Sequence, residues 1–198
     1  MLQSYLHKHL IEAGCDEAGR GCLAGPVFAA AVILPPNTNH ELLRDSKKLN
    51  VQQRLTMRQW IETNALTFAV AQLSAQQIDK INILNASIKA MHLALDKLTI
   101  TPQFLLIDGN RFKTYNGIKH QCVVKGDNTF ACIAAASILA KTYRDEFILT
   151  MHNEFPQYDW INNKTYGTAK HIAAIQKFGN TKYHRKSFVV KAKQLSCF

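Results

Sequence analysis

The chain has 198 residues, of which 47% are hydrophobic and 19% charged, a composition that excludes a disordered, collagen-like or low-complexity protein. The length suits one domain. The 24 lysines and arginines exceed the 14 aspartates and glutamates by ten, and this net charge of +10 favours a polyanionic partner.

The first part of the chain predicts two strands, a helix and a third strand. Apolar segments over 14–19 and 26–34 are joined by a short glycine-containing link, so we expect them to be antiparallel neighbours. Residues 51–66 have apolar side chains at helical spacing, and Asn50 before them is a residue type that caps helices. Residues 67–73 predict the next strand.

The middle of the chain alternates helices with strands. A capping box over 74–77 indicates a short helix, and an amphipathic helix is expected over 82–98. Strands over 104–107 and 121–124 follow, and then a long helix over 129–152.

The last third predicts loops with one short helix over 168–178. Because helices alternate with strands but tight turns join the first strands, the pattern predicts an α/β fold with a mixed central sheet flanked by helices.

The positive charge is concentrated at the C-terminal end. After Asp159 there are no acidic residues, and there are eight basic ones: Lys164, Lys170, Lys177, Lys182, Arg185, Lys186, Lys191 and Lys193. This pattern is typical of a surface that binds nucleic acid or an anionic membrane, although a merely basic soluble surface is an alternative.

Membrane and export signals are absent from the sequence. No stretch approaches the roughly 20 apolar residues that span a bilayer, and residues 1–9 contain no apolar segment of the signal-peptide type. The five cysteines form no pair or cluster with zinc spacing. We therefore expect reduced, buried cysteines in a cytoplasmic protein that does not bind membranes.

Acidic residues lie at unusual places. Asp16 and Glu17 lie in a stretch of small residues, Asp108 ends a buried strand, and Asp127 follows another. For each acid taken alone, the alternative is that it caps a helix or turn or pairs with a lysine. Together they would repel one another, and Mg²⁺ or Mn²⁺ would relieve that repulsion. Two such ions can support phosphodiester cleavage.

Two further features suggest ligand contact. In Gly19-Arg20-Gly21 the glycines allow the backbone to approach a ligand closely, but a tight hairpin turn is the alternative. Tyr166 lies in a polar loop, where it would either stack on a nucleotide or pack internally. Residues 184–186 would either bind phosphate or form solvated surface.

These features occur within an ordered series of motifs: DEAGRG at 16–21, DSK at 45–47, NILNA at 82–86, DG at 108–109, KGD at 125–127, KTYGT at 164–168 and HRKSF at 184–188. The series strongly resembles type 2 ribonuclease H, which is ribonuclease HII in bacteria, and it covers nearly the whole chain. The resemblance implies a ribonuclease H-like fold with a small helical C-terminal part. Residues 1–198 would form a single catalytic domain, in which about 155–198 are a basic substrate-contacting extension.

The resemblance also implies an activity. It is an endoribonuclease activity that cleaves the RNA strand of RNA/DNA hybrids, and single ribonucleotides embedded in duplex DNA, by two-metal-ion hydrolysis. The products would carry a 3′-hydroxyl and a 5′-phosphate, and the role would be ribonucleotide removal from DNA. We expect a monomer.

Individual roles follow from the same motifs. The catalytic and metal-binding residues would be Asp16, Glu17, Asp108 and Asp127, which would hold Mg²⁺ or Mn²⁺. The substrate-binding residues would be Gly19, Arg20, Gly21, Tyr166 and Lys47. Asp145 matches a further acid of the family, and as a metal ligand it ranks below the four catalytic acids.

Three other classes remain open on the residues alone. A metal-dependent nuclease or phosphotransferase without ribonucleotide specificity would cut all-DNA duplexes equally well. An inert binding module would bind without turnover, but it would leave the strand-end acids unexplained. A dinucleotide-binding enzyme is disfavoured because no GxGxxG motif precedes a helix.

Overall fold

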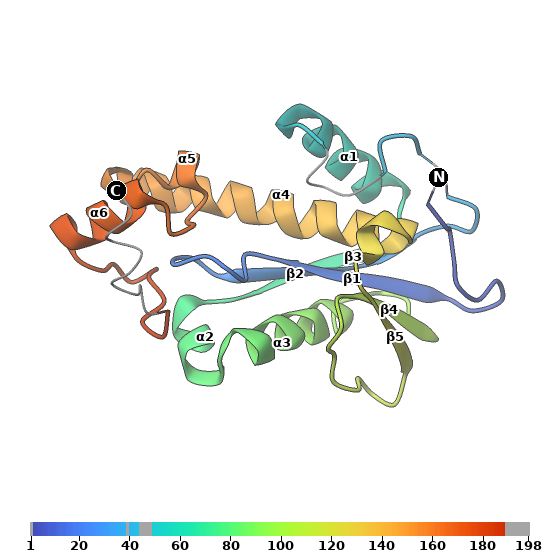
Figure 1. The fold of residues 1–198 in the computed structure, drawn as a ribbon. Coiled ribbons are helices and arrows are strands. Elements are labelled where there is room, and N and C mark those ends of the chain that lie inside the picture. Colours follow the sequence, from blue (N-terminus) through green and yellow to red (C-terminus); the bar gives the residue numbers. More distant parts are fainter. Residues whose placement is uncertain (1, 39, 44–48, 189–198) are drawn as a thin grey trace.

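The computed structural model describes residues 2–38, 40–43 and 49–188, which form a mixed five-stranded sheet of order β3-β2-β1-β4-β5 (Figure 1). The strands are β1 (Glu12–Ala18), β2 (Val27–Ile33), β3 (Thr67–Leu73), β4 (Phe104–Asp108) and β5 (Lys119–Val123). β2 is antiparallel to both β1 and β3, whereas β4 is parallel to both β1 and β5. The α/β fold with a mixed sheet is therefore confirmed.

Helices cover both faces of this sheet. They are α1 (Val51–Asn64), α2 (Ala75–Ile81), α3 (Ile83–Leu95), α4 (Ala131–Glu154), α5 (Trp160–Asn163) and α6 (Ala169–Phe178), with 3₁₀ turns η2 (Gly126–Asn128) and η3 (Pro156–Tyr158). In Figure 1, α4 and α1 lie on one side of the sheet and α2 and α3 on the other, while α5 and α6 lie beyond the C-terminal end of α4. None of the described helices has the length and apolar character needed to cross a membrane.

The apolar run of β2 reflects burial on both faces. Side chains from Val27 to Ile33 at odd positions belong to the core beneath α3, and Ala30 and Val32 belong to the core beneath α4. A strand covered on both faces has no polar side, which explains a continuous apolar sequence instead of an alternating one.

Helix α4 lies unusually close to β1. A Cβ atom built on Gly14 would lie 2.3 Å from the carbonyl carbon of Cys132 and 2.4 Å from the nitrogen of Ile133. Only glycine permits this backbone approach. The close contact lays the first turn of α4 against the strand that carries Asp16.

Most of the predicted elements are present, and their caps follow the expected chemistry. Asn50 and Ser74 each form a capping box at the start of α1 and α2. The prediction for the last third was incomplete, because η3 and α5 also form there. They are too short to show helical periodicity, and the stacking of buried Tyr158 on Trp160, with ring centroids 5.0 Å apart, holds them instead.

The cysteines agree with the expectation of buried thiols. Cys15, Cys22 and Cys132 are free and buried, and Cys122 is free and half-buried. Cys197 lies outside the described residues.

Candidate active site

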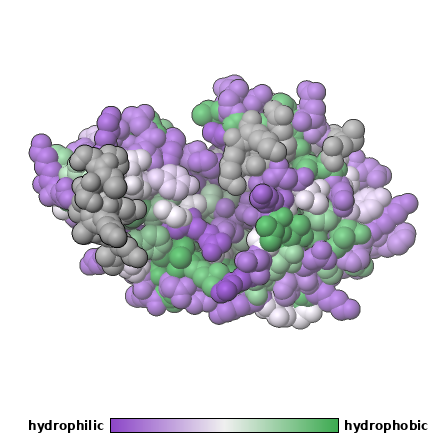
Figure 2. Space-filling view, in the orientation of Figure 1, coloured by the Kyte–Doolittle hydropathy of each residue, from purple (hydrophilic) through white to green (hydrophobic). Residues whose placement is uncertain are grey.

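Parallel pairing brings the acids of β1 and β4 together. Cys15 pairs with Ile107, and continuing this register by one residue sets Asp16 opposite Asp108. Asp16, Glu17 and Asp108 line one pocket of about 360 Å³. Its other lining residues are Ala18, Gly19, Arg20, Gly21, Ser137, Lys141, Arg144 and Tyr166. The face shown in Figure 2 is hollowed between α1 and the C-terminal helices, with hydrophilic residues around the hollow.

Asp16 is the most strongly perturbed acid. Its side chain is buried, and burial raises its pKa well above the ordinary value of an aspartate. The negative charges of Glu17 and Asp108 raise the pKa further. A hydrogen bond from the Ser137 side chain opposes the rise, as does one from the Glu17 amide, whose nitrogen lies 2.6 Å from Asp16 Oδ1. Ionised Asp16 is therefore costly until a cation approaches it.

Glu17 and Asp108 each have a partner within the protein. Burial raises the pKa of Glu17, and Arg20 opposes this rise through a 3.0 Å contact between Arg20 Nη1 and Glu17 Oε1. Asp108 Oδ1 accepts a hydrogen bond of 2.8 Å from the Gly126 amide. The alternative in which an acid pairs with a basic side chain or caps a turn thus describes part of what these two side chains do.

The other two acids do not line the pocket. Asp127 is buried in η2, where its Oδ1 accepts a 3.1 Å hydrogen bond from Asn128 Nδ2. It directly follows Gly126, whose amide is bound by Asp108. Asp145 is held by Lys141, with Nζ 2.8 Å from Oδ1. The structure therefore brings three of the four predicted catalytic acids into one pocket wall.

The donor chemistry of the pocket suits a hard divalent cation. Carboxylate oxygens are the ligands that Mg²⁺ and Mn²⁺ prefer, and a cation would favour the ionised forms of Asp16 and Glu17, whose pKa values burial raises. In the side-chain positions described, no group of three His, Cys, Asp or Glu residues stands in a metal-holding arrangement. Glu17 Oε1 contacts Arg20 and Asp108 Oδ1 accepts from the Gly126 amide, so a cation would compete with these partners for the same oxygens.

The Gly19–Arg20–Gly21 loop joins β1 to β2 and forms another wall of the pocket. Gly19 has a φ of +97°, and a Cβ there would lie 2.5 Å from Arg144 Nε, so a larger residue does not fit. At Gly21 a Cβ would lie 3.9 Å from Tyr166 Cε1. The loop and the tyrosine are thus neighbours.

Tyr166 is not a packing tyrosine. It is 48% exposed and faces the pocket. The carbon of the Arg144 guanidinium lies 5.9 Å from its ring centroid. An exposed aromatic ring beside this glycine-containing loop is available to stack on a sugar or base.

Sequence reasoning gave no role to the α4 residues that line the pocket. Ser137, Lys141 and Arg144 are spaced by four and three residues, which puts them on one helical face. Polar residues at this spacing in an otherwise apolar helix were the available signal. Burial lowers the pKa of Lys141, while Arg144 Nη2 donates to the Lys164 carbonyl at 2.7 Å.

The two alternatives considered for residues 184–186 are wrong for the first two of them. His184 and Arg185 are buried, so neither forms solvated surface nor reaches a phosphate. The reason is tertiary: this segment pairs with residues 23–25 beneath the pocket. Lys186 is exposed, and Lys47 lies outside the described residues.

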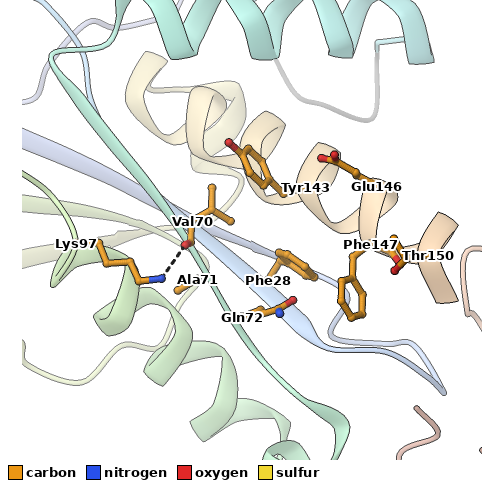
Figure 3. A pocket seen from close by; sticks show the side chains of 9 residues that line it. All are labelled: Phe28, Val70, Ala71, Gln72, Lys97, Tyr143, Glu146, Phe147 and Thr150. Carbon is orange, nitrogen blue, oxygen red and sulfur yellow. Dashed lines mark hydrogen bonds between the residues drawn. The ribbon is translucent and has the colours of Figure 1, made fainter. Parts of the chain in front are cut away.

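A second pocket, of about 450 Å³, lies between β3 and α4 (Figure 3). Lys97 and Glu146 are its charged residues, and Glu146 is paired with Arg58 at 2.8 Å. Lys97 Nζ lies 3.4 Å from the Val70 carbonyl. Its walls contain aromatic and small side chains without a group of acids, so this pocket offers no comparable site for cation-assisted chemistry.

Comparisons with known proteins find relatives that match most of the chain. The family model described as Ribonuclease HII matches residues 13–191. Ribonuclease HII of Phocaeicola vulgatus is 60% identical over 188 residues, which cover 95% of this chain and 94% of the relative.

Solved structures share the fold. RNase HII of Archaeoglobus fulgidus, solved in a complex with PCNA, superposes with a TM-score of 0.77 at 22% identity, covering 96% of this chain and all of that one. Bst-RNase HIII in complex with Mn²⁺ has a TM-score of 0.70 at 18% identity, covering 94% of this chain and 70% of that one.

Proposed function

The chain belongs to the ribonuclease HII family of endoribonucleolytic hydrolases, and we propose that it cleaves RNA/DNA hybrids and single ribonucleotides embedded in duplex DNA. The observation that carries this proposal is the pocket that joins three strand-end acids to the glycine loop and an exposed tyrosine. The acids suit hydrolysis of a phosphodiester. The loop and the tyrosine suit recognition of a sugar, since the 2′-hydroxyl distinguishes RNA from DNA.

Members of the ribonuclease H family depend on divalent metal ions, and we propose that this chain uses two, Mg²⁺ or Mn²⁺. Asp16, Glu17 and Asp108 would hold them, with Asp127 completing the set. When bound, such cations make water a stronger nucleophile and stabilise charge on the departing 3′ oxygen. The products of the reaction would carry a 3′-hydroxyl and a 5′-phosphate.

The remaining residues of the pocket bind and orient the substrate. Lys141 lines the pocket together with the acids, and its positive charge can attract the phosphate, while Arg144 holds the neighbouring loop through the Lys164 carbonyl. Gly19, Arg20 and Gly21 bring backbone groups to the 2′-hydroxyl, and Tyr166 stacks on the sugar. Lys47 and the basic extension would hold the duplex through its phosphates, which makes binding dependent on salt.

We propose that residues 1–198 act as one catalytic domain, with about 155–198 as its substrate-contacting extension. We also propose that the protein acts as a monomer. Removal of ribonucleotides from chromosomal DNA would place the protein in the bacterial cytoplasm.

The test compares wild type with Asp108→Asn on three duplexes: one with a single ribonucleotide, an RNA/DNA hybrid, and all DNA. Wild type should cut the first two, not the third, and EDTA should stop cleavage. Asp108→Asn should abolish turnover while hybrid binding survives.

Asp96→Asn is the matched control, since Asp96 is exposed at the end of α3 and accepts a hydrogen bond from Tyr115. Its activity should equal that of wild type. Equal cleavage of the all-DNA duplex would favour a general nuclease, and normal turnover by Asp108→Asn would overturn the assignment.

A further inference from the structure

One segment from the far end of the chain lies directly beneath the glycine loop. Residues 183–185 run antiparallel to residues 23–25, centred on a bridge between Ala24 and His184. Two backbone hydrogen bonds of 2.9 Å flank this bridge. The pairing delivers the Arg185 side chain to the inner side of the loop that lines the pocket.

The Arg185 guanidinium binds three backbone carbonyls of this loop. Its Nη2 lies 2.7 Å from the Gly19 oxygen, and its Nη1 and Nε lie 2.9 Å from the oxygens of Arg20 and Gly25. The side chain is 2% exposed, and within the described residues no carboxylate forms an ion pair with it. Burial lowers its pKa to about 10, so it stays charged at neutral pH.

Fixing these carbonyls also fixes the amides that follow them. A peptide unit is planar and trans, so its N–H points opposite to its C=O. The Gly19 carbonyl shares a plane with the Arg20 amide, and the Arg20 carbonyl shares one with the Gly21 amide. With both oxygens bound to the buried Arg185, both N–H groups point away from it.

Those two amides are available to a ligand. Neither the Arg20 nor the Gly21 N–H donates to any other residue in the described part of the chain, and both residues line the pocket. A glycine-flanked peptide can rotate easily, because glycine tolerates both signs of φ. Without an anchor, this loop would present its donors in many directions.

We propose that Arg185 is a positioning residue that sets the direction of the Arg20 and Gly21 N–H groups, and through them the preference for a ribonucleotide. This inference rests on the proposed function. Lysine cannot replace the arginine, because its compact ammonium lacks the planar fork that reaches three carbonyls at once.

The experiment measures kcat and KM of Arg185→Lys on the single-ribonucleotide duplex. It also measures Kd for that duplex and for all-DNA duplex in EDTA, with thermal unfolding of each variant. Arg58→Lys is the matched control, because Arg58 pairs with Glu62 within α1 and with Glu146 on α4, outside the pocket lining.

We expect kcat of Arg185→Lys to fall on the order of 100-fold, because displacement of about 1 Å at a positioning group has that effect. KM and the Kd for all-DNA duplex should stay near wild type, since phosphate contacts dominate duplex binding. Any difference in Kd between the single-ribonucleotide duplex and the all-DNA duplex should disappear in the variant.

Unchanged kcat in a folded Arg185→Lys would overturn the inference. The inference would also be overturned if Arg185→Lys bound both duplexes equally more weakly and had a lowered Tm, because that pattern marks a purely structural residue. If wild type itself fails to cut the ribonucleotide duplex, the proposed function fails first, and this result is distinct from either.

Discussion

Two walls of the pocket differ in whether their charged groups have partners. The strand-end wall is formed by Asp16, Glu17 and Asp108, and the loop wall is formed by the Gly19–Arg20–Gly21 loop. On the strand side, burial and mutual repulsion raise the pKa values of Asp16 and Glu17. On the loop side, the buried guanidinium groups of Arg144 and Arg185 donate to carbonyls of the loops around the pocket.

This difference separates charges that do chemistry from charges that build shape. A crowded carboxylate lowers the stability of the protein until a cation arrives, so selection for folding alone would remove it. A buried guanidinium with its hydrogen bonds made keeps two loops in place. The strand-end wall should therefore respond to metal and the loop wall to changes of geometry.

Asp16→Asn, on the strand-end wall, should have a larger effect than any change on the loop wall. Activity should fall on the order of 10³-fold, as when an enzyme loses a preorganised electrostatic group. The Tm without metal should stay or rise, because the neutral amide ends the repulsion with Glu17 and Asp108. Calorimetry with and without Mg²⁺ should show metal stabilisation of wild type but not of this variant. A large loss of Tm in the variant would contradict the comparison.

On the loop wall, Tyr166→Ala should lower kcat/KM on the single-ribonucleotide duplex by about 10–100-fold, since stacking on an aromatic ring contributes about 1–3 kcal/mol. Tyr166→Phe keeps the ring and should stay close to wild type. Steady-state kinetics of the pair separate stacking from the hydroxyl. Equal losses in both variants would assign the effect to the hydroxyl instead.

The smallest effect should be on the pH dependence of the protein's thermal stability, through His184 behind the loop wall. His184 Nδ1 accepts a 2.9 Å hydrogen bond from the Thr181 amide, and its other ring nitrogen lies 3.3 Å from His171 Nε2. Burial, with the charge of His171, lowers the pKa of His184 from 6.5 to about 4. The unfolded chain therefore takes up a proton first as the pH falls, so this stability is present above pH 6.5 and is lost towards pH 4.

Thermal unfolding of wild type and His184→Gln between these pH values checks the sign. The wild-type Tm should fall with pH more steeply than that of the variant, at roughly 2–4 °C for each kcal/mol lost. The raised pKa of Asp16 acts in the opposite direction, because its contribution decreases as the pH rises. Parallel profiles for the two proteins would exclude His184 as the group responsible.

Much of the fold could be predicted because its signals are local. The apolar run of β2, the helical spacing in α3 and the caps at Asn50 and Ser74 each depend on neighbouring residues. Part of the site was also predictable, since parallel strands bring their carboxyl ends together at one edge of a sheet. That rule sets Asp16 beside Asp108 once the structure shows that β1 and β4 are parallel neighbours.

Other features gave weak signals or none. The face formed by Ser137, Lys141 and Arg144 was visible in the spacing, but nothing local showed that it would lie against β1. The four residues of α5 span barely one helical turn and cannot show a repeated spacing, and the aromatic contact of Trp160 stabilises this turn instead.

The amino-acid sequence by itself determined the strands, the helices with their caps, and the motif series that marks the family, because hydrophobic period and capping chemistry act over a few residues. Only the tertiary structure decided that Arg185 binds the carbonyls of Gly19, Arg20 and Gly25 from the opposite end of the chain. It also decided that Asp127 is buried in a turn while its three fellow acids line the pocket. Both outcomes depend on the path of the folded backbone, which brings distant peptide groups within hydrogen-bonding distance.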